Sequence, residues 1–227
     1  NVGKVKEILG EDAPIDSLEL VMNPDNMSKL ADCGVHFLDA PAEMLPMAMK
    51  YLGLNPDSHE DEDIAKAEEA LLAIRPYIQK FHSSEYIQAL ANGDICVAVG
   101  WSGDILQARD RAVEAENGVE IAFNAPKEGA QMWFDQMAIP VDAPNVDGAH
   151  KFLNFIMDAE NMAAASNYVY YANGNKASQE FLIEDVMGDP AIYPSAETLD
   201  NLFTTTPYAP KVQRVVTRAW TKIKSGI

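Results

Sequence analysis

The chain has 227 residues, 48% of them hydrophobic, and carries 35 acidic against 17 basic side chains, which gives a formal net charge of −18. This composition is sufficient for a substantial buried core and excludes a disordered chain. The negative field repels phosphate backbones, which excludes a nucleic-acid partner, and it attracts cations, although solubility alone also explains such a charge.

Helices and short apolar runs alternate along the chain. Apolar spacing and capping residues predict helices at 2–9, near 24–33, 42–52, 61–75, 86–91, 102–116, 146–157, 159–167, 176–186, 195–203 and 211–224. A capping-box-like Ser84 begins the fifth of these helices, and Asn92-Gly93 is expected to close it. Phe152, Phe155 and Ile156 are expected on the buried side of the helix at 146–157. "VHFLD", "ICVAVG", "VEIAFNAP" and "QMWFDQMAIP" are typical of strands.

Strands separated by helices predict an α/β fold with a mostly parallel sheet, in which ligands bind at the carboxyl ends of the strands. Several acids and aromatics lie at such positions. Asp39 and Glu43 follow "VHFLD", Trp101 and Asp104 follow "ICVAVG", and Trp133 and Asp135 lie on "QMWFDQMAIP". The pattern therefore predicts a group of carboxylates and aromatic rings without a matching group of bases.

Enzyme signatures are absent from the sequence. There is no GxSxG, no phosphate-binding loop and no dinucleotide GxGxxG, and the four histidines form no ligand pair for a metal, so we expect neither a cofactor nor a metal. A carboxylate-pair hydrolase using Glu43 with Asp104 or Asp135 stays open as an alternative function, as does a receptor for another cationic or neutral solute. His82 beside Ser83 and Ser84 is better explained by helix capping than by nucleophilic catalysis.

An ionised carboxylate beside an aromatic ring is a receptor for an organic ammonium group. A rod-shaped diamine needs acids at both ends with aromatic walls between them. Trp101, Trp133 and Tyr171 are the candidate walls, and Glu43, Asp104 and Asp135 are the candidate ends. Ordinary core packing is the alternative for each aromatic residue alone.

The two cysteines, Cys33 and Cys96, lie far apart and belong to no CxxC motif, which argues against zinc and against a thioredoxin-like site. One structural disulfide and two separate buried thiols both remain open. No stretch approaches the ~20 apolar residues of a membrane helix, and the first residues do not show the basic–apolar–small pattern of a signal peptide. The abrupt start predicts a mature protein or a fragment.

The segments "HSSEYIQALANGDICVAVGWSGDILQA", "APKEGA", "WFDQMAIP", "YANGNKAS" and "RAWTKIKSG" resemble the periplasmic polyamine-binding proteins of ABC importers, the putrescine and spermidine receptors of Gram-negative bacteria. The similarity runs along the whole chain and is nearest to the putrescine type. It implies a type II periplasmic-binding-protein-like fold, a non-enzymatic receptor with a polyamine ligand, a periplasmic location, and the membrane permease subunits of an importer as partner.

The resemblance also implies a role for individual residues. Glu43, Trp101, Asp104, Asp135 and Tyr171 match ligand-contacting positions of the family. Trp133 stands where the family usually has phenylalanine, which leaves ligand choice open. Cys33 and Cys96 match positions that look like a disulfide pair.

In the family, two lobes close on the ligand, and the resemblance implies that most of the first lobe is absent here. Residues 1–118 then form most of the second lobe, 119–171 return into the first, and 172–227 complete the second. We expect weaker binding than in a complete receptor. Residues 129–160 are expected to expose apolar surface that is either covered by self-association or weakly protected from hydrogen exchange.

Overall fold

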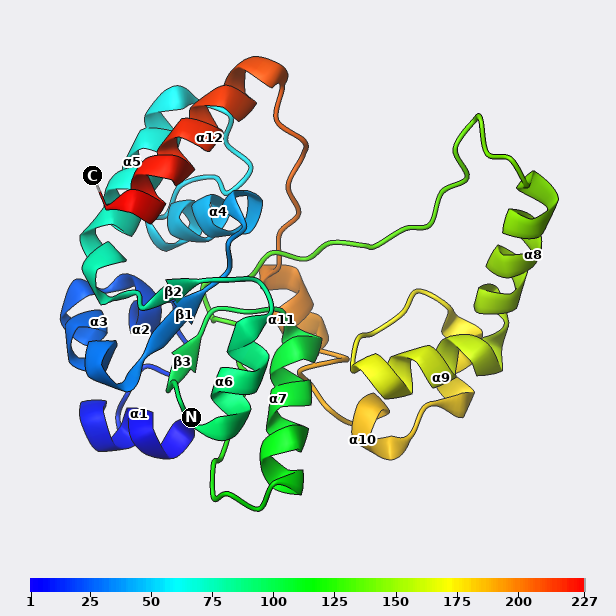
Figure 1. Cartoon of the computed structure of the whole chain (residues 1–227), viewed down its shortest axis with the longest axis horizontal. Helices are drawn as coiled ribbons and strands as arrows, with labels where there is room; N and C mark the ends of the chain where they lie inside the picture. The colour runs from blue at the N-terminus through cyan, green and yellow to red at the C-terminus, as the bar shows by residue number, and fades with distance from the viewer. Residues whose placement is uncertain (227) are drawn as a thin grey trace. The chain divides into compact units, whose positions relative to one another are not determined.

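The computed structural model describes residues 1–226 and contains a parallel sheet in the order β2-β1-β3 (Figure 1). Its strands are β1 (Val35–Phe37), β2 (Lys80–Phe81) and β3 (Val97–Ala98). His36 pairs with Lys80 on one side and with Ala98 on the other, so β1 is the central strand. The predicted α/β class with a parallel sheet is confirmed.

The chain divides into two units, which are described separately. The first comprises Asn1–Met132 and everything from Ala196 onward, and the second comprises Trp133–Ser195. The lobe boundaries expected from the resemblance, after residues 118 and 171, remain predictions.

The helices of the first unit agree closely with the ranges expected from apolar spacing, except that no helix was expected over residues 19–22. They are α1 (Val2–Leu9), α2 (Glu19–Met22), α3 (Pro24–Leu30), α4 (Pro41–Tyr51), α5 (Asp61–Ile74), α6 (Glu85–Asn92), α7 (Ser102–Glu114), α11 (Ala196–Asn201) and α12 (Pro210–Ser225), with 3₁₀ turns η1 (Ala31–Cys33) and η2 (Arg75–Tyr77). Fully buried side chains from strand and helices alike, such as those of Phe37, Leu45, Ile64 and Tyr86, form one core.

The start of α6 differs from the prediction. No Ser84 side chain caps this helix; instead, Nδ1 of His82 accepts the backbone N–H groups of Ser84 and Glu85, each at 3.1 Å. The imidazole thus satisfies donors that a helix start leaves unpaired. The end of α6 is as expected, because Gly93 adopts the left-handed conformation, with φ 77°, that closes a helix.

The C-terminal helix α12 runs beside α5 and is fastened to it at several points (Figure 1). The Arg75 guanidinium donates to the carbonyl of Lys224 from Nε at 3.1 Å and from Nη2 at 3.0 Å. Nζ of Lys222 pairs with Glu68 at 2.9 Å. A cation is favourable at these last carbonyls of a helix, so the interaction stabilises its end.

Two predicted strands are wrong. Residues 119–126 are irregular, and "QMWFDQMAIP" contributes only an isolated bridge between Gln131 and Phe203. A strand is more stable than hydrated coil only when a neighbouring strand forms hydrogen bonds with its backbone. Among residues 1–226 no such neighbour lies beside 133–140, so the alternating pattern does not produce a strand there.

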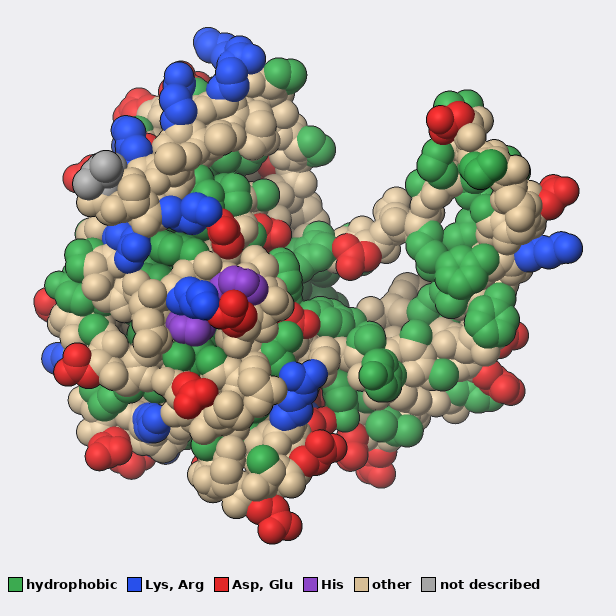
Figure 2. Space-filling model, in the orientation of Figure 1, with side chains coloured by type: hydrophobic (Ala, Val, Ile, Leu, Met, Phe, Trp, Pro, Cys, Tyr) green, Lys and Arg blue, Asp and Glu red, His purple; other side chains and the backbone are tan. Residues whose placement is uncertain are grey.

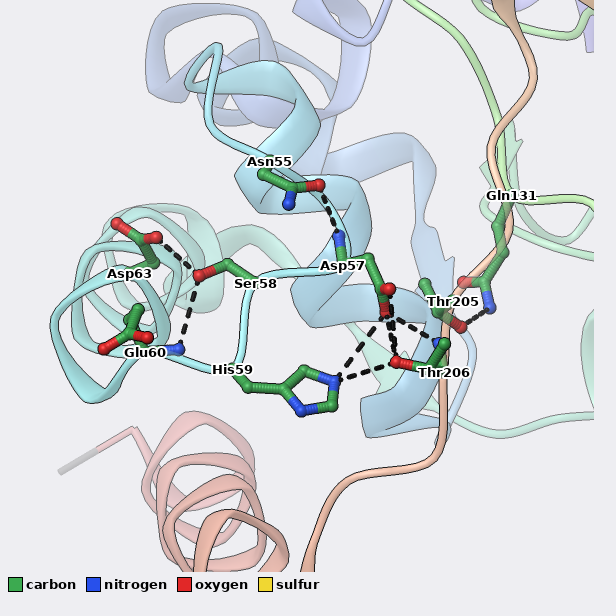
Figure 3. Close-up of polar contacts among 9 residues, drawn as sticks. All are labelled: Asn55, Asp57, Ser58, His59, Glu60, Asp63, Gln131, Thr205 and Thr206. Atoms are coloured by element: carbon green, nitrogen blue, oxygen red, sulfur yellow. Dashed lines mark hydrogen bonds and ion pairs between the residues drawn. The ribbon is translucent and has the colours of Figure 1, made fainter.

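The segment that leads into α12 is held by the loop between α4 and α5 (Figure 3). Asp57 accepts the Thr206 N–H at 2.6 Å through Oδ1 and the Thr206 hydroxyl at 3.0 Å. Nε2 of His59 lies 3.2 Å from the same hydroxyl. One residue earlier, the Thr205 hydroxyl accepts from Nε2 of Gln131 at 2.9 Å, which joins the two segments that lead out of and back into this unit.

The second unit contains α8 (Val146–Met157), α9 (Ala159–Val169), the 3₁₀ helix η3 (Lys176–Phe181) and α10 (Glu184–Met187). The single helix expected over 176–186 is therefore two short ones. Extended backbone at Leu182 and Ile183 separates them. Side chains of "YANGNKAS" hold η3 against α9: Nδ2 of Asn173 donates to the Ser166 hydroxyl at 2.9 Å, and Oδ1 of Asn173 accepts from the buried Ser178 hydroxyl at 2.9 Å.

The apolar side of α8 is exposed, contrary to the prediction that it is buried. Phe152 is 55% exposed and Phe155 58%, and Ile156 is only half-buried. Figure 2 shows hydrophobic side chains gathered over this helix. The amphipathic pattern is present, but no element of the second unit packs on that side of the helix.

No helix in residues 1–226 combines the length and the apolar character needed to span a membrane. The disulfide between Cys33 and Cys96 is present, with Cα atoms 5.5 Å apart. It joins the residues just before β1 and β3, which confirms the pairing that the resemblance implied and excludes two separate thiols.

Replacing both cysteines by serine should lower the free energy of unfolding of the first unit by about 4 kcal/mol, because the bond closes a loop of 63 residues in the unfolded chain. Urea unfolding followed by circular dichroism measures the loss. The unsubstituted chain in excess reductant is the control and should show the same loss. Equal midpoints for the oxidised and reduced chains would contradict the expectation.

Candidate functional site

The carboxyl ends of β1 and β3 meet at one edge of the sheet. Val35 pairs with Val97 in parallel register, so the residues that follow the two strands leave from the same side. Helix α4 begins at Pro41 and helix α7 at Ser102, both shortly after their strand. Glu43 and Asp104 are each in the first turn of these helices, where the helix dipole favours a negative charge.

Asp104 is held by a buried tyrosine. The hydroxyl of Tyr86, whose side chain is fully buried on α6, donates to Oδ2 of Asp104 at 2.7 Å. The same hydroxyl accepts the backbone N–H of Trp101 at 3.3 Å. Trp101 is half-buried and packs against the core of the first unit. One side chain therefore fixes both the carboxylate and the backbone that carries the indole ring.

Gly100 makes this arrangement sterically accessible. A Cβ atom at position 100 would lie 2.6 Å from Cε2 of Tyr86 and 3.1 Å from Cδ1 of Ile105. Any larger residue would displace the tyrosine ring. Gly100 thus leaves room for the Tyr86 ring, whose hydroxyl contacts Trp101 and Asp104.

Glu43 lies in a different environment. Its side chain is half-buried, and burial raises the pKa of its carboxyl, with only its own backbone N–H acting in the opposite direction. No cation within residues 1–226 contributes to this shift. A desolvated carboxylate without a counterion is destabilised in its charged form, so a bound cation would relieve it.

Asp39, the other acid after β1, is already paired within the chain. Its Oδ1 accepts from Nε1 of Trp220 at 2.8 Å and its Oδ2 pairs with Nζ of Lys224 at 2.9 Å. Burial opposes ionisation of Asp39, but these hydrogen bonds outweigh it and hold the pKa below its ordinary value. We assign this residue a structural role at the docking of α12.

The other three residues expected in the site belong to the second unit. Trp133, which is 44% exposed, and Asp135, also exposed, lie in the irregular segment that was expected to be a strand. Tyr171 is half-buried and follows Tyr170, which ends α9 in the left-handed conformation with φ 60°. Within residues 1–226 no cluster of His, Cys, Asp or Glu is suited to a metal ion.

Sequence reasoning missed Tyr86, which lies in the quoted stretch "HSSEYIQAL" but was assigned only to a helix. A tyrosine at a helical position whose neighbours are apolar gives no signal that its hydroxyl reaches an acid 18 residues later. Sequence reasoning also did not predict that the C-terminal helix supplies the hydrogen-bond and ion-pair partners of Asp39.

Comparison with known proteins adds a family to this geometry. The family model described as bacterial extracellular solute-binding protein matches residues 19–194. Two relatives are each 51% identical over the whole chain: the putrescine-binding periplasmic protein SpuD of Pseudomonas aeruginosa and the putrescine-binding periplasmic protein PotF of Escherichia coli. The chain spans 62% of the length of the first and 61% of the second.

The fold is shared with solved structures. A putative spermidine/putrescine ABC transporter protein from Listeria monocytogenes matches with a TM-score of 0.82 at 26% identity, covering 96% of this chain and 64% of the other. This confirms the periplasmic-binding-protein-like fold of type II, of which the chain represents a part.

The Gly100→Ala substitution should destabilise the first unit by about 1–3 kcal/mol, because the added methyl group overlaps the Tyr86 ring. Urea unfolding measures the change. Gly3→Ala is the matched control, since a Cβ at position 3 of α1 meets nothing closer than 3.8 Å, and it should leave stability equal or slightly higher. Equal unfolding midpoints for the two variants would refute the packing argument.

Proposed function

The chain belongs to the bacterial extracellular solute-binding protein family, and from that premise we propose that it is a periplasmic receptor for a polyamine, with putrescine as ligand. The observation that carries the proposal is the position of Glu43 and Asp104, with Trp101, after two adjacent strands. The two relatives that are 51% identical are both named for putrescine binding, which favours the diamine over the longer spermidine.

The chemistry of these residues suits a protonated amine. Asp104, fixed by Tyr86, supplies an oriented carboxylate that accepts hydrogen bonds from an ammonium group. The Trp101 ring offers a face for the cation or for the methylene chain, and such a contact contributes roughly 0.5–2 kcal/mol when desolvated. No cation within residues 1–226 offsets the burial of Glu43, so a bound ammonium group gives this carboxylate a counterion. We further propose Trp133, Asp135 and Tyr171 as ligand residues of the second unit.

A receptor of this kind passes its ligand to the membrane permease subunits of an importer, and we propose that class of partner here. A ligand that contacts the closed form better than the open form shifts the population toward closure, and no covalent chemistry is needed. The proposal accordingly assigns no catalytic residue. The net charge of −18 assists by attracting a dication from solution.

Asp104→Asn should weaken putrescine binding about 10- to 100-fold, because the ammonium loses a charged hydrogen-bond acceptor. Isothermal titration of the 227-residue chain with putrescine, cadaverine and spermidine measures the change. Glu114→Gln, the same charge change at an exposed position of the same helix, is the control and should bind as the unsubstituted chain does. The proposal fails if the unsubstituted chain does not bind putrescine or if Asp104→Asn binds it equally well.

Binding should also weaken as the pH falls toward the raised pKa of Glu43. Burial raises the pKa of Glu43, so acidification protonates this carboxyl early and removes its charge, whereas a bound ammonium favours the ionised form. Binding therefore releases a proton, and affinity rises with pH. Glu43→Gln should flatten this profile, as measured by titration in buffers of different ionisation enthalpy. An identical pH profile in the variant would remove Glu43 from the site.

A further inference from the structure

We propose that Tyr86 is a positioning residue for ligand binding: its hydroxyl holds the Asp104 carboxylate and the Trp101 backbone in the orientation that receives the ammonium group. This inference rests on the proposed function and deepens it, because it assigns the affinity of the site partly to a side chain buried behind it.

The hydrogen bonds fix the direction of the hydroxyl. A tyrosine hydroxyl has one proton to donate. The Trp101 N–H approaches its oxygen as a donor at 3.3 Å, so the hydroxyl proton is directed to Oδ2 of Asp104 at 2.7 Å. The carboxylate is thereby held in one orientation before any ligand arrives.

The tyrosine side chain is fully buried and closely packed. It is 0% exposed, and α6 packs along α7, the helix that carries Asp104. The ring lies so close to Gly100 that a single methyl group there would overlap it. The start of α6 is secured by His82, which accepts the N–H of Glu85. A rigid donor lowers the entropy that the carboxylate loses when it binds a cation.

A second tyrosine provides a matched control. The hydroxyl of Tyr51, at the end of α4, donates to Oε2 of Glu19 at 2.8 Å, so this pair has the same chemistry as Tyr86 with Asp104. Burial, together with this hydrogen bond, raises the pKa of Tyr51 to about 12. Glu19 belongs to no candidate site, so the loss of this hydroxyl affects stability without affecting a ligand.

The experiment compares Tyr86→Phe with Tyr51→Phe, each of which removes one hydroxyl and keeps the ring. Putrescine titration should show binding about tenfold weaker for Tyr86→Phe and within about twofold of the unsubstituted chain for Tyr51→Phe. Urea unfolding of Tyr86→Phe, of Asp104→Ala and of the double variant should show that the two losses of stability are not additive, because they remove the same hydrogen bond.

The possible results are distinguishable. If the unsubstituted chain does not bind putrescine, the proposed function fails, and this role fails with it. If the unsubstituted chain binds and Tyr86→Phe binds equally well, or if Tyr51→Phe weakens binding as much as Tyr86→Phe does, the positioning role alone is overturned. Additive stability losses, or a Tyr86→Phe chain that does not fold, likewise overturn it, because the hydroxyl then acts only in the fold.

Discussion

The parallel pairing of β1 with β3 is the constraint from which the candidate site follows. Each strand is only two or three residues long, yet the pairing of Val35 with Val97 sets where the segments after β1 and β3 leave the sheet. A shift in that register would move the start of α4 relative to the start of α7 and separate the acids that follow. The core helices stabilise the sheet, but its register determines which side chains are neighbours at its edge.

The acidic residues of this chain are distinguished by the groups that contact them in the structure. Asp39 is paired with Trp220 and Lys224 of α12, and Asp57 accepts a hydrogen bond from Thr206 in the segment before α12. Both acids therefore hold the C-terminal part of the chain in place. No cation within residues 1–226 contributes to the pKa of Glu43, and Asp104 accepts a hydrogen bond from the Tyr86 hydroxyl. Asp39 and Asp57 therefore act in the fold, whereas Glu43 and Asp104 are candidates for the site.

Much of the first unit could be predicted from the sequence, because its helices and strands follow local periodicity and capping. The second unit was harder: the alternation around Trp133 and the amphipathic pattern at Phe152 describe surfaces that require a neighbour, and residues 1–226 do not provide one there. In the site, the acid and the aromatic of "GWSGD" could be found, since they follow an apolar strand. The contact with Tyr86 could not, because a hydrogen bond across 18 residues depends on how α6 packs on α7.

The Cys33–Cys96 bond joins the amino ends of β1 and β3, whereas the candidate binding residues follow their carboxyl ends. The covalent link and the candidate binding residues therefore lie at opposite ends of the same two strands. Saturation libraries at positions 43, 101 and 104 could alter ligand preference while the crosslink continues to hold the strand pair together. The same separation makes the exposed Asp32 and Asp94, which lie just before the crosslinked cysteines, suitable places to attach a fluorophore or a surface tether in a biosensor, away from the candidate binding residues.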